Sequence, residues 1–159
     1  EDVMNRYPVD PDNIFLSGYS YGSIMAWRVA CDRGGAMNIR ALLGISGTLR
    51  LDEDCAEAPK EARHVHGLKD NVLDFPYGPD GDTTYPVKLW RDALGCSAAS
   101  STPVDWSVVE FLTLTRTPWA DCAGDAQVAL DTHPGGHFIP HGWIARQLDE
   151  LLGRPPSYP

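Results

Sequence analysis

The chain has 159 residues, of which 43% are hydrophobic and 22% charged, a composition that supports one globular domain with a sizeable core over residues 1–159. Its 22 acidic residues outnumber 13 basic ones, and the formal net charge of −9 disfavours a nucleic-acid partner because phosphate backbones repel such a surface. No apolar run reaches the ~18 residues that cross a bilayer, so we expect no membrane partner.

Short apolar runs typical of buried strands alternate along the chain with longer segments of helical pattern. In chain order, we expect a strand at 13–17, a helix at 23–31, strands at 39–45 and 62–66, a helix at 86–94, a β-rich stretch at 108–115 that can pair with 127–131, and a closing helix at 142–152. Strands that alternate with helices favour the α/β class, with a parallel sheet covered by helices on both faces.

The pentapeptide Gly18-Tyr19-Ser20-Tyr21-Gly22 has the pattern G-x-S-x-G and lies between a predicted strand and a predicted helix. This is the setting of a nucleophile elbow, a sharp turn that exposes a serine hydroxyl. Such a turn demands residues almost without side chains two positions before and after the serine, and Gly18 and Gly22 meet that demand. We predict Ser20 as a nucleophile and the backbone N–H of Tyr21 as an oxyanion donor. A chance glycine–serine turn is the alternative, which the flanking strand and helix disfavour.

A serine nucleophile needs a histidine base, and behind this kind of elbow the chain order is serine, acid, histidine. We predict His137 as the base, because the two glycines before it allow a mobile loop that brings the imidazole over the elbow. The other histidines either come too early in the chain for this order or are expected to be ordinary surface or pocket residues: His64, His66, His133 and His141.

The carboxylate that orients the base is expected just beyond a strand, between Ser20 and His137. Asp70 directly follows the third predicted strand and is the predicted acid. Asp74 is a competitor four residues on, whereas Asp80 and Asp82 lie in a glycine-rich stretch typical of an ordinary loop.

Four cysteines, Cys31, Cys55, Cys96 and Cys122, allow three disulfide pairings, of which the chain-local one closes two loops of similar size. No two have the C-x-x-C spacing of a zinc knuckle or a thioredoxin motif. Four buried free thiols of a cytosolic protein are the alternative.

Three motifs occur in a fixed order: the strand and elbow at Val9–Gly22, the acid turn H-G-x-x-D within Val65–Asp70, and Gly135–Pro140, where the histidine follows glycines and precedes an aromatic residue and a proline. Together with Trp90, Cys96 and Cys122, they resemble the extracellular polyhydroxybutyrate depolymerase and feruloyl/acetylxylan esterase group of α/β-hydrolases, over nearly the whole chain. The resemblance implies an exported serine esterase with Ser20 as nucleophile, Asp70 as acid and His137 as base. It also implies a Cys96–Cys122 disulfide, which leaves Cys31 and Cys55 as the second pair.

The sequence departs from the group at two places. Tyr21 replaces the small residue usual after the nucleophile, where its bulk would narrow the site or contact an acyl group, and Ser23 stands where a second glycine is common. Such hydrolases run to roughly 200–300 residues, with early strands and an upstream oxyanion loop before the elbow. We therefore expect an N-terminally incomplete α/β-hydrolase domain whose elbow strand has an open edge, covered by a second copy in a homodimer or by another polypeptide.

The expected function is that of a secreted serine carboxylic ester hydrolase, acting through an acyl-enzyme and without a metal or organic cofactor. Its expected substrates are polyester or plant-polysaccharide acyl esters: polyhydroxybutyrate, feruloyl or acetyl esters. The alternatives are a serine peptidase of the same fold and an inactive remnant that serves as a binding module.

Overall fold

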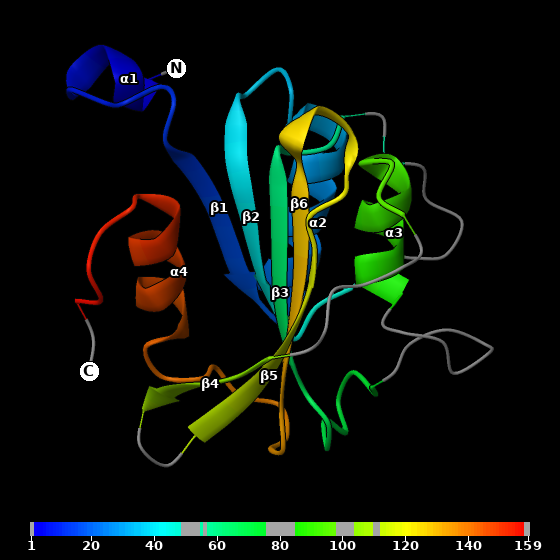
Figure 1. The fold of residues 1–159 in the computed structure, drawn as a ribbon. Coiled ribbons are helices and arrows are strands. Elements are labelled where there is room, and N and C mark those ends of the chain that lie inside the picture. The colour runs from blue at the N-terminus through cyan, green and yellow to red at the C-terminus, as the bar shows by residue number, and fades with distance from the viewer. Residues whose placement is uncertain are drawn as a thin grey trace.

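Six strands form one sheet in the computed structural model of the chain, which describes residues 2–48, 55, 57–75, 85–97, 104–109 and 112–157 (Figure 1). The spatial order is β1-β2-β3-β6-β5-β4. The strands are β1 (Ile14–Tyr19), β2 (Ile39–Ile45), β3 (Glu61–Gly67), β4 (Val104–Val109), β5 (Leu112–Trp119) and β6 (Gln127–His133). β1, β2, β3 and β6 run parallel to one another, whereas β5 pairs antiparallel with β6 and β4 pairs antiparallel with β5.

Helices cover both faces of this sheet, which confirms the predicted α/β class (Figure 1). The helices are α1 (Asp2–Arg6), α2 (Tyr21–Arg33), α3 (Tyr85–Ala93) and α4 (Trp143–Leu151), with a 3₁₀ turn at Ala123–Asp125. On one face Trp27 of α2 packs against Trp90 of α3, with the ring centres 4.9 Å apart. On the other face Trp143 of α4 is fully buried against residues of the central strands.

The expectation of a purely parallel sheet is wrong at one side. The stretch predicted as a single β-rich segment at 108–115 belongs to two strands, β4 and β5, which pair antiparallel. A parallel connection needs a crossover of about a dozen residues or more. Only two residues separate β4 from β5, and seven separate β5 from β6, so both connections fold back antiparallel.

Two disulfides join the four cysteines in the chain-local pairing. Cys31 of α2 bonds to Cys55, and Cys96, just after α3, bonds to Cys122 beside the 3₁₀ turn. Each bond therefore anchors one of the two helices on the same face of the sheet, at the end where that helix stops.

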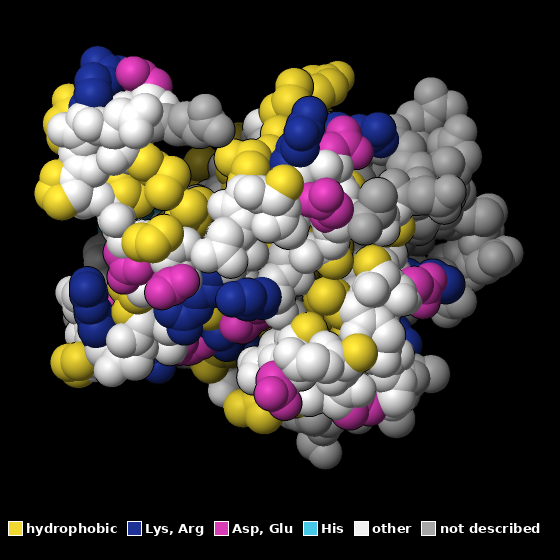
Figure 2. Space-filling view, turned by 90° about the horizontal axis from the view of Figure 1, so that it is seen from above, with side chains coloured by type: hydrophobic (Ala, Val, Ile, Leu, Met, Phe, Trp, Pro, Cys, Tyr) yellow, Lys and Arg dark blue, Asp and Glu magenta, His cyan; other side chains and the backbone are white. Residues whose placement is uncertain are grey.

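The strand that precedes the predicted elbow lies at the edge of the sheet. β1 pairs only with β2 among the described strands, and most of its residues are half-buried, whereas β2 is almost wholly buried. Beyond it, α1 has no buried residue. Figure 2 shows the end of the molecule at which the parallel strands begin, where hydrophobic side chains of the amino-terminal segment are exposed: Val3, Met4, Tyr7 and Val9. None of the described helices has the length and apolar character to cross a membrane.

Candidate active site

Three loops meet at the carboxyl ends of the parallel strands, at the lower end of the sheet in Figure 1. Ser20 follows β1, Asp70 lies beyond the end of β3, and His137 lies beyond the end of β6. Parallel strands end at the same edge, where open α/β sheets bind their ligands. Residues far apart in the sequence are thereby brought together at this edge.

The backbone of Ser20 is held in an unusual conformation, with φ 54° and ψ −123°. Side-chain-bearing residues rarely adopt it, and such strain costs on the order of 1–3 kcal/mol. Two hydrogen bonds hold the turn: the Ser20 N–H donates to Ile45 O at 3.0 Å, and the Ile24 N–H donates to Ser20 O at 3.0 Å. The serine side chain is thus presented at the very start of α2.

The two glycines of the motif differ in what they contribute. A Cβ added at Gly18 would lie 2.1 Å from the carbonyl oxygen of Gly22, so helix and strand approach so closely only because Gly18 has no side chain. A Cβ at Gly22 would meet nothing within 4 Å. The expectation that both positions must lack side chains therefore holds at Gly18 and is wrong at Gly22.

Ser20, His137 and Asp70 form an unbroken chain of hydrogen bonds. The Nδ1 atom of His137 lies 2.7 Å from Asp70 Oδ2, and its Nε2 atom lies 2.9 Å from Ser20 Oγ. Because a carboxylate only accepts, Nδ1 carries the proton, and the lone pair of Nε2 then accepts from the serine hydroxyl. This is the arrangement in which an imidazole removes a proton from a nucleophile.

The carboxylate of Asp70 is fully buried and anchored on both oxygens. Its Oδ1 atom accepts from the backbone N–H groups of Val72 and Leu73, each at 2.9 Å. Burial raises the pKa of Asp70, but the hydrogen bonds from Leu73, His137 and Val72 outweigh burial and hold this pKa below its ordinary value. Asp70 is therefore ionised at neutral pH. The competitor Asp74 is exposed, and Asp80 and Asp82 lie outside the described residues.

The acid turn and the histidine loop are joined by their backbones. The Leu68 N–H donates to His133 O at 2.8 Å, and the Lys69 N–H donates to Gly135 O at 2.9 Å. A Cβ at Gly67 would lie 2.4 Å from the carbonyl oxygen of Gly136, so the absence of a side chain lets these segments touch. Main-chain contacts thus hold the loops of Asp70 and His137 next to each other.

Two histidines that the sequence reasoning set aside extend this chain inward. His64 Nε2 lies 3.1 Å from His66 Nδ1, and His66 Nε2 lies 2.8 Å from Leu73 O and 3.2 Å from Asp70 Oδ2. They were dismissed because they precede the acid in the chain. Two features of the sequence could have indicated this contact. His64 and His66 are two residues apart on a strand, which places both side chains on one face of β3, and His66 is four residues before Asp70.

The buried histidines around the acid are held neutral. Burial lowers the pKa of His64 well below its ordinary value, and burial also lowers the pKa of His66, although Leu73 and Asp70 oppose the change. Burial lowers the pKa of His133 to about 4, and its Nδ1 accepts from the Gly135 N–H. His141, by contrast, is exposed.

A small pocket of about 70 Å³ opens beside the nucleophile. Its lining is mostly apolar and comes from the start of α2 and from the acid loop: Ser20, Tyr21, Ile24, Val72 and Leu73. The side chain of Tyr21 is 85% exposed, so it forms an outer wall and leaves the serine hydroxyl accessible. Within the described ranges, no group of three or more His, Cys, Asp or Glu side chains is placed to hold a metal ion.

Comparison with known proteins finds esterases. No protein-family model matches the chain. It is 25% identical over 122 residues to the bifunctional acetylxylan esterase/xylanase XynS20E of Neocallimastix patriciarum, a match over 77% of this chain and 17% of that protein. It is 33% identical over 78 residues to a probable feruloyl esterase C of Aspergillus niger, over 49% of this chain and 28% of that protein. The chain thus spans less than a third of the length of either relative.

Proposed function

We propose that this chain, of α/β-hydrolase type, is a serine carboxylic ester hydrolase that acts on acyl esters of plant polysaccharides. The observation that carries the proposal is the hydrogen-bond chain Ser20–His137–Asp70 at the start of α2. The two relatives are named as an acetylxylan esterase and a feruloyl esterase, and these names support acyl esters as the substrate class.

In the proposed reaction, Ser20 Oγ attacks the acyl carbon while His137 Nε2 takes the hydroxyl proton. Asp70 keeps the imidazole in the required tautomer and stabilises its positive charge, and it stays ionised throughout. His137 next gives the proton to the departing alcohol, which leaves an acyl-serine. Water, activated by the same imidazole, then releases the acid and restores Ser20.

The start of α2 supplies electrostatic stabilisation in the proposed reaction. Tyr21 is the first residue of a 13-residue helix, whose N-terminus carries positive dipole charge. We assign its backbone N–H as a donor to the oxyanion that forms on the carbonyl oxygen. Losing one such donor costs about 3–4 kcal/mol of barrier.

The site and the disulfides bear on substrate and location. The pocket beside Ser20 is small and apolar, which suits an acyl group better than a charged residue. The relatives favour polysaccharide esters over polyhydroxybutyrate as the substrate. Two disulfides are typical of proteins from oxidising compartments, so we propose that the protein is secreted.

The test is covalent labelling combined with turnover. The purified chain is treated with a serine-directed fluorophosphonate, and the labelled peptide is identified by mass spectrometry. We expect the label on Ser20, hydrolysis of nitrophenyl acetate and methyl ferulate, and no hydrolysis of aminoacyl nitroanilides.

Ser17→Ala is the matched control for Ser20→Ala, because Ser17 lies three residues earlier, on β1, and its hydroxyl donates to Leu43 O, away from His137 and Asp70 in the hydrogen-bond chain. Ser20→Ala should lose label and turnover together, whereas Ser17→Ala should keep both. Labelling of Ser20→Ala at the native rate would contradict the proposal.

A further inference from the structure

Asp70 has two histidine neighbours, and the mechanism above uses only one. His137 Nδ1 lies 2.7 Å from Asp70 Oδ2, and His66 Nε2 lies 3.2 Å from the same oxygen. His66 comes from the middle of the sheet, and its side chain is fully buried. A fully buried polar side chain thus lies beside the carboxylate of Asp70, in addition to the imidazole that meets Ser20.

The partners of His66 determine which of its nitrogens carries the proton. Nε2 lies 2.8 Å from the carbonyl oxygen of Leu73, which can only accept, so Nε2 is the protonated nitrogen. Nδ1 is then the acceptor, and His64 Nε2 at 3.1 Å must donate to it. The protonated nitrogen of His66, which donates to Leu73 O, therefore also lies 3.2 Å from Asp70 Oδ2.

The same N–H also anchors the loop that bears the acid. His66 holds the carbonyl oxygen of Leu73, while the N–H of Leu73 donates to Asp70 Oδ1 at 2.9 Å. The backbone N–H of Leu73 thus holds the loop to the carboxylate of Asp70, and the carbonyl oxygen of Leu73 holds the loop to His66 on β3. Leu73 also lines the pocket beside Ser20, so this contact joins the acid to a wall of the site.

We propose that His66, as a neutral Nε2–H donor, is a positioning residue that fixes the carboxylate of Asp70 against His137. The proposal rests on the proposed function for its kinetic part only. His66 acts through Asp70 and touches no reacting atom.

The surroundings of His66 keep it neutral, which the role requires. Its titratable neighbours are His64 on the same strand, Asp70 on the acid loop, and His133 and His137 from β6 and its loop. The ring of Phe75 covers it at 5.6 Å between ring centres. A second cation beside Asp70 would compete with the imidazolium that forms on His137, so a neutral donor holds the carboxylate without weakening that pairing.

The test compares His66→Leu, which removes the donor, with His66→Gln, whose side-chain amide places an N–H near the position of Nε2. For His66→Leu we expect kcat for nitrophenyl acetate to fall roughly 10- to 100-fold with KM unchanged, because the acid is displaced from the base. The pKa of Asp70, followed by carboxyl ¹³C NMR, should rise. His66→Gln should recover most of both changes.

Two further measurements on the native protein keep the test decisive if His66→Leu does not fold. Nitrogen-15 NMR of labelled histidine should show His66 neutral at neutral pH with the proton on Nε2. A protonated ring or the Nδ1–H form would overturn the proposal. So would equal losses in both variants with an unchanged pKa of Asp70, since a purely structural role predicts that result. A native protein without esterase activity contradicts the proposed function alone, and the tautomer and the Asp70 titration then decide the role of His66.

Discussion

Two buried carboxylates, Asp70 and Asp131, have the same number of nitrogen neighbours, but the charge of those neighbours differs. Each side chain is fully buried, and each oxygen of each carboxylate has two nitrogen neighbours. For Asp131, Oδ1 accepts from Trp106 Nε1 and Arg116 Nε, and Oδ2 accepts from Arg116 Nη2 and Trp143 Nε1. For Asp70, the backbone N–H groups of Val72 and Leu73 donate to Oδ1, whereas His137 Nδ1 and His66 Nε2 lie 2.7 and 3.2 Å from Oδ2.

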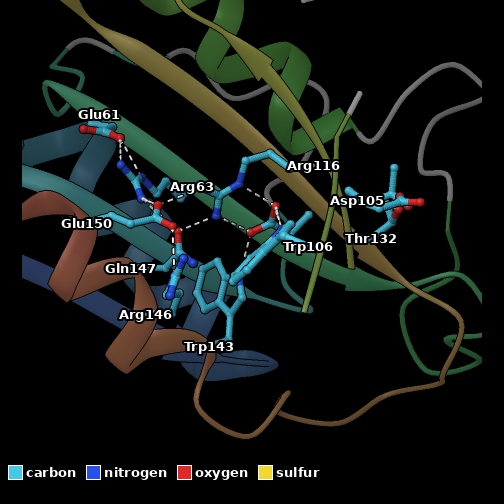
Figure 3. Close-up of polar contacts among 12 residues, drawn as sticks. Glu61, Arg63, Asp105, Trp106, Arg116, Thr132, Trp143, Arg146, Gln147 and Glu150 are labelled. Atoms are coloured by element: carbon cyan, nitrogen blue, oxygen red, sulfur yellow. Dashed lines mark hydrogen bonds and ion pairs between the residues drawn. The ribbon is translucent and has the colours of Figure 1, made fainter. Parts of the chain in front are cut away.

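The arginine cluster around Asp131 joins α4 to the sheet (Figure 3). Arg116 of β5 and Arg63 of β3 both donate to Glu150 Oε2, at 2.8 and 2.7 Å, and both donate to Gln147 Oε1. Burial lowers the pKa of Arg116, but Asp131 and Glu150 outweigh it and raise the pKa above its ordinary value. The cation is therefore permanent.

The two carboxylates differ in the nitrogen groups that they face. Asp131 faces a guanidinium that never gives up its proton, so its pairing can only hold elements together. Asp70 faces imidazoles, which unlike a guanidinium exist in neutral as well as charged forms, and one of them touches a serine hydroxyl. A carboxylate with four nitrogen neighbours thus joins packed elements at Asp131 and, in the proposed reaction, supports proton transfer at Asp70.

The largest expected effect is on turnover, from Asp70→Asn. The amide keeps the shape of the side chain but favours the wrong tautomer of His137, so kcat should fall roughly 10⁴-fold while the fold survives. Steady-state kinetics with nitrophenyl acetate measures this. Asp74→Asn, four residues on and exposed, is the control and should stay within about threefold of the native rate. The opposite result would make Asp74 the acid.

Asp131→Asn should act on stability instead. It leaves Arg116 half-paired in a buried setting, and breaking such a pair costs about 3–5 kcal/mol of the free energy of unfolding. Urea unfolding measures the loss. The exposed pair of Lys88 and Asp92 gives the control: Asp92→Asn should change stability by less than about 0.5 kcal/mol. Similar losses in both variants would remove the distinction between buried and exposed pairs.

Lowering the pH should remove the stability contributions of His133, near Asp70, and of Glu150, beside Arg116, over two different pH ranges. His133 has a pKa of about 4 when folded and 6.5 as its ordinary value, so below 6.5 the unfolded chain binds the proton first. The free energy of unfolding should therefore fall by about 3 kcal/mol from this residue as pH drops from 6.5 to 4. Paired Glu150 has a lowered pKa, so its contribution is lost only below its ordinary 4.5.

Unfolding measured across this pH range, in His133→Gln and Glu150→Gln, checks the separation. His133→Gln should reduce the fall in the free energy of unfolding between pH 6.5 and 4. Glu150→Gln should reduce the fall below pH 4.5. A native stability that does not change between pH 6.5 and 4 would show that His133 does not resist protonation.

The smallest effect is expected where the two regions meet, at Tyr19. Its hydroxyl donates to His137 O at 3.0 Å, while its ring packs with the hydrophobic cluster on the α4 face. Tyr19→Phe removes one hydrogen bond, worth about 1 kcal/mol, and should lower kcat only a few-fold. Thermal unfolding and kinetics on the same preparation measure both. A kcat loss as large as that of Asp70→Asn would place Tyr19 in the reaction itself.

Most of the fold could be predicted because its strands are short apolar runs with glycines and prolines between them. The predicted elements at 39–45, 62–66 and 142–152 agree with β2, β3 and α4 to within one residue at each end. The turn between β4 and β5 was missed because the residues from Val108 to Leu112, apolar except for Glu110, include no glycine or proline to mark a turn. The connection lengths were the better guide, since they exclude parallel crossovers.

Motifs along the chain predicted the candidate residues Ser20, Asp70 and His137, and the structure brings these three together. The neighbours that act through space were not. His66 meets Asp70 because the chain after β3 folds back over the strand end, and Arg116 meets Asp131 through the register of β5 and β6. Neither contact has a sequence signal stronger than a spacing.

The place of β1 at the sheet edge has a consequence for motion. β3 and β6 each have a hydrogen-bonded strand on both sides, so the strand ends that carry the loops of Asp70 and His137 are held by two ladders. The nucleophile strand separates by opening one, and local opening follows the number of contacts that must break. Amide hydrogen exchange in β1 should therefore be faster than in β3 or β6, so that Ser20 is the first of the three residues to lose its alignment when the native state fluctuates.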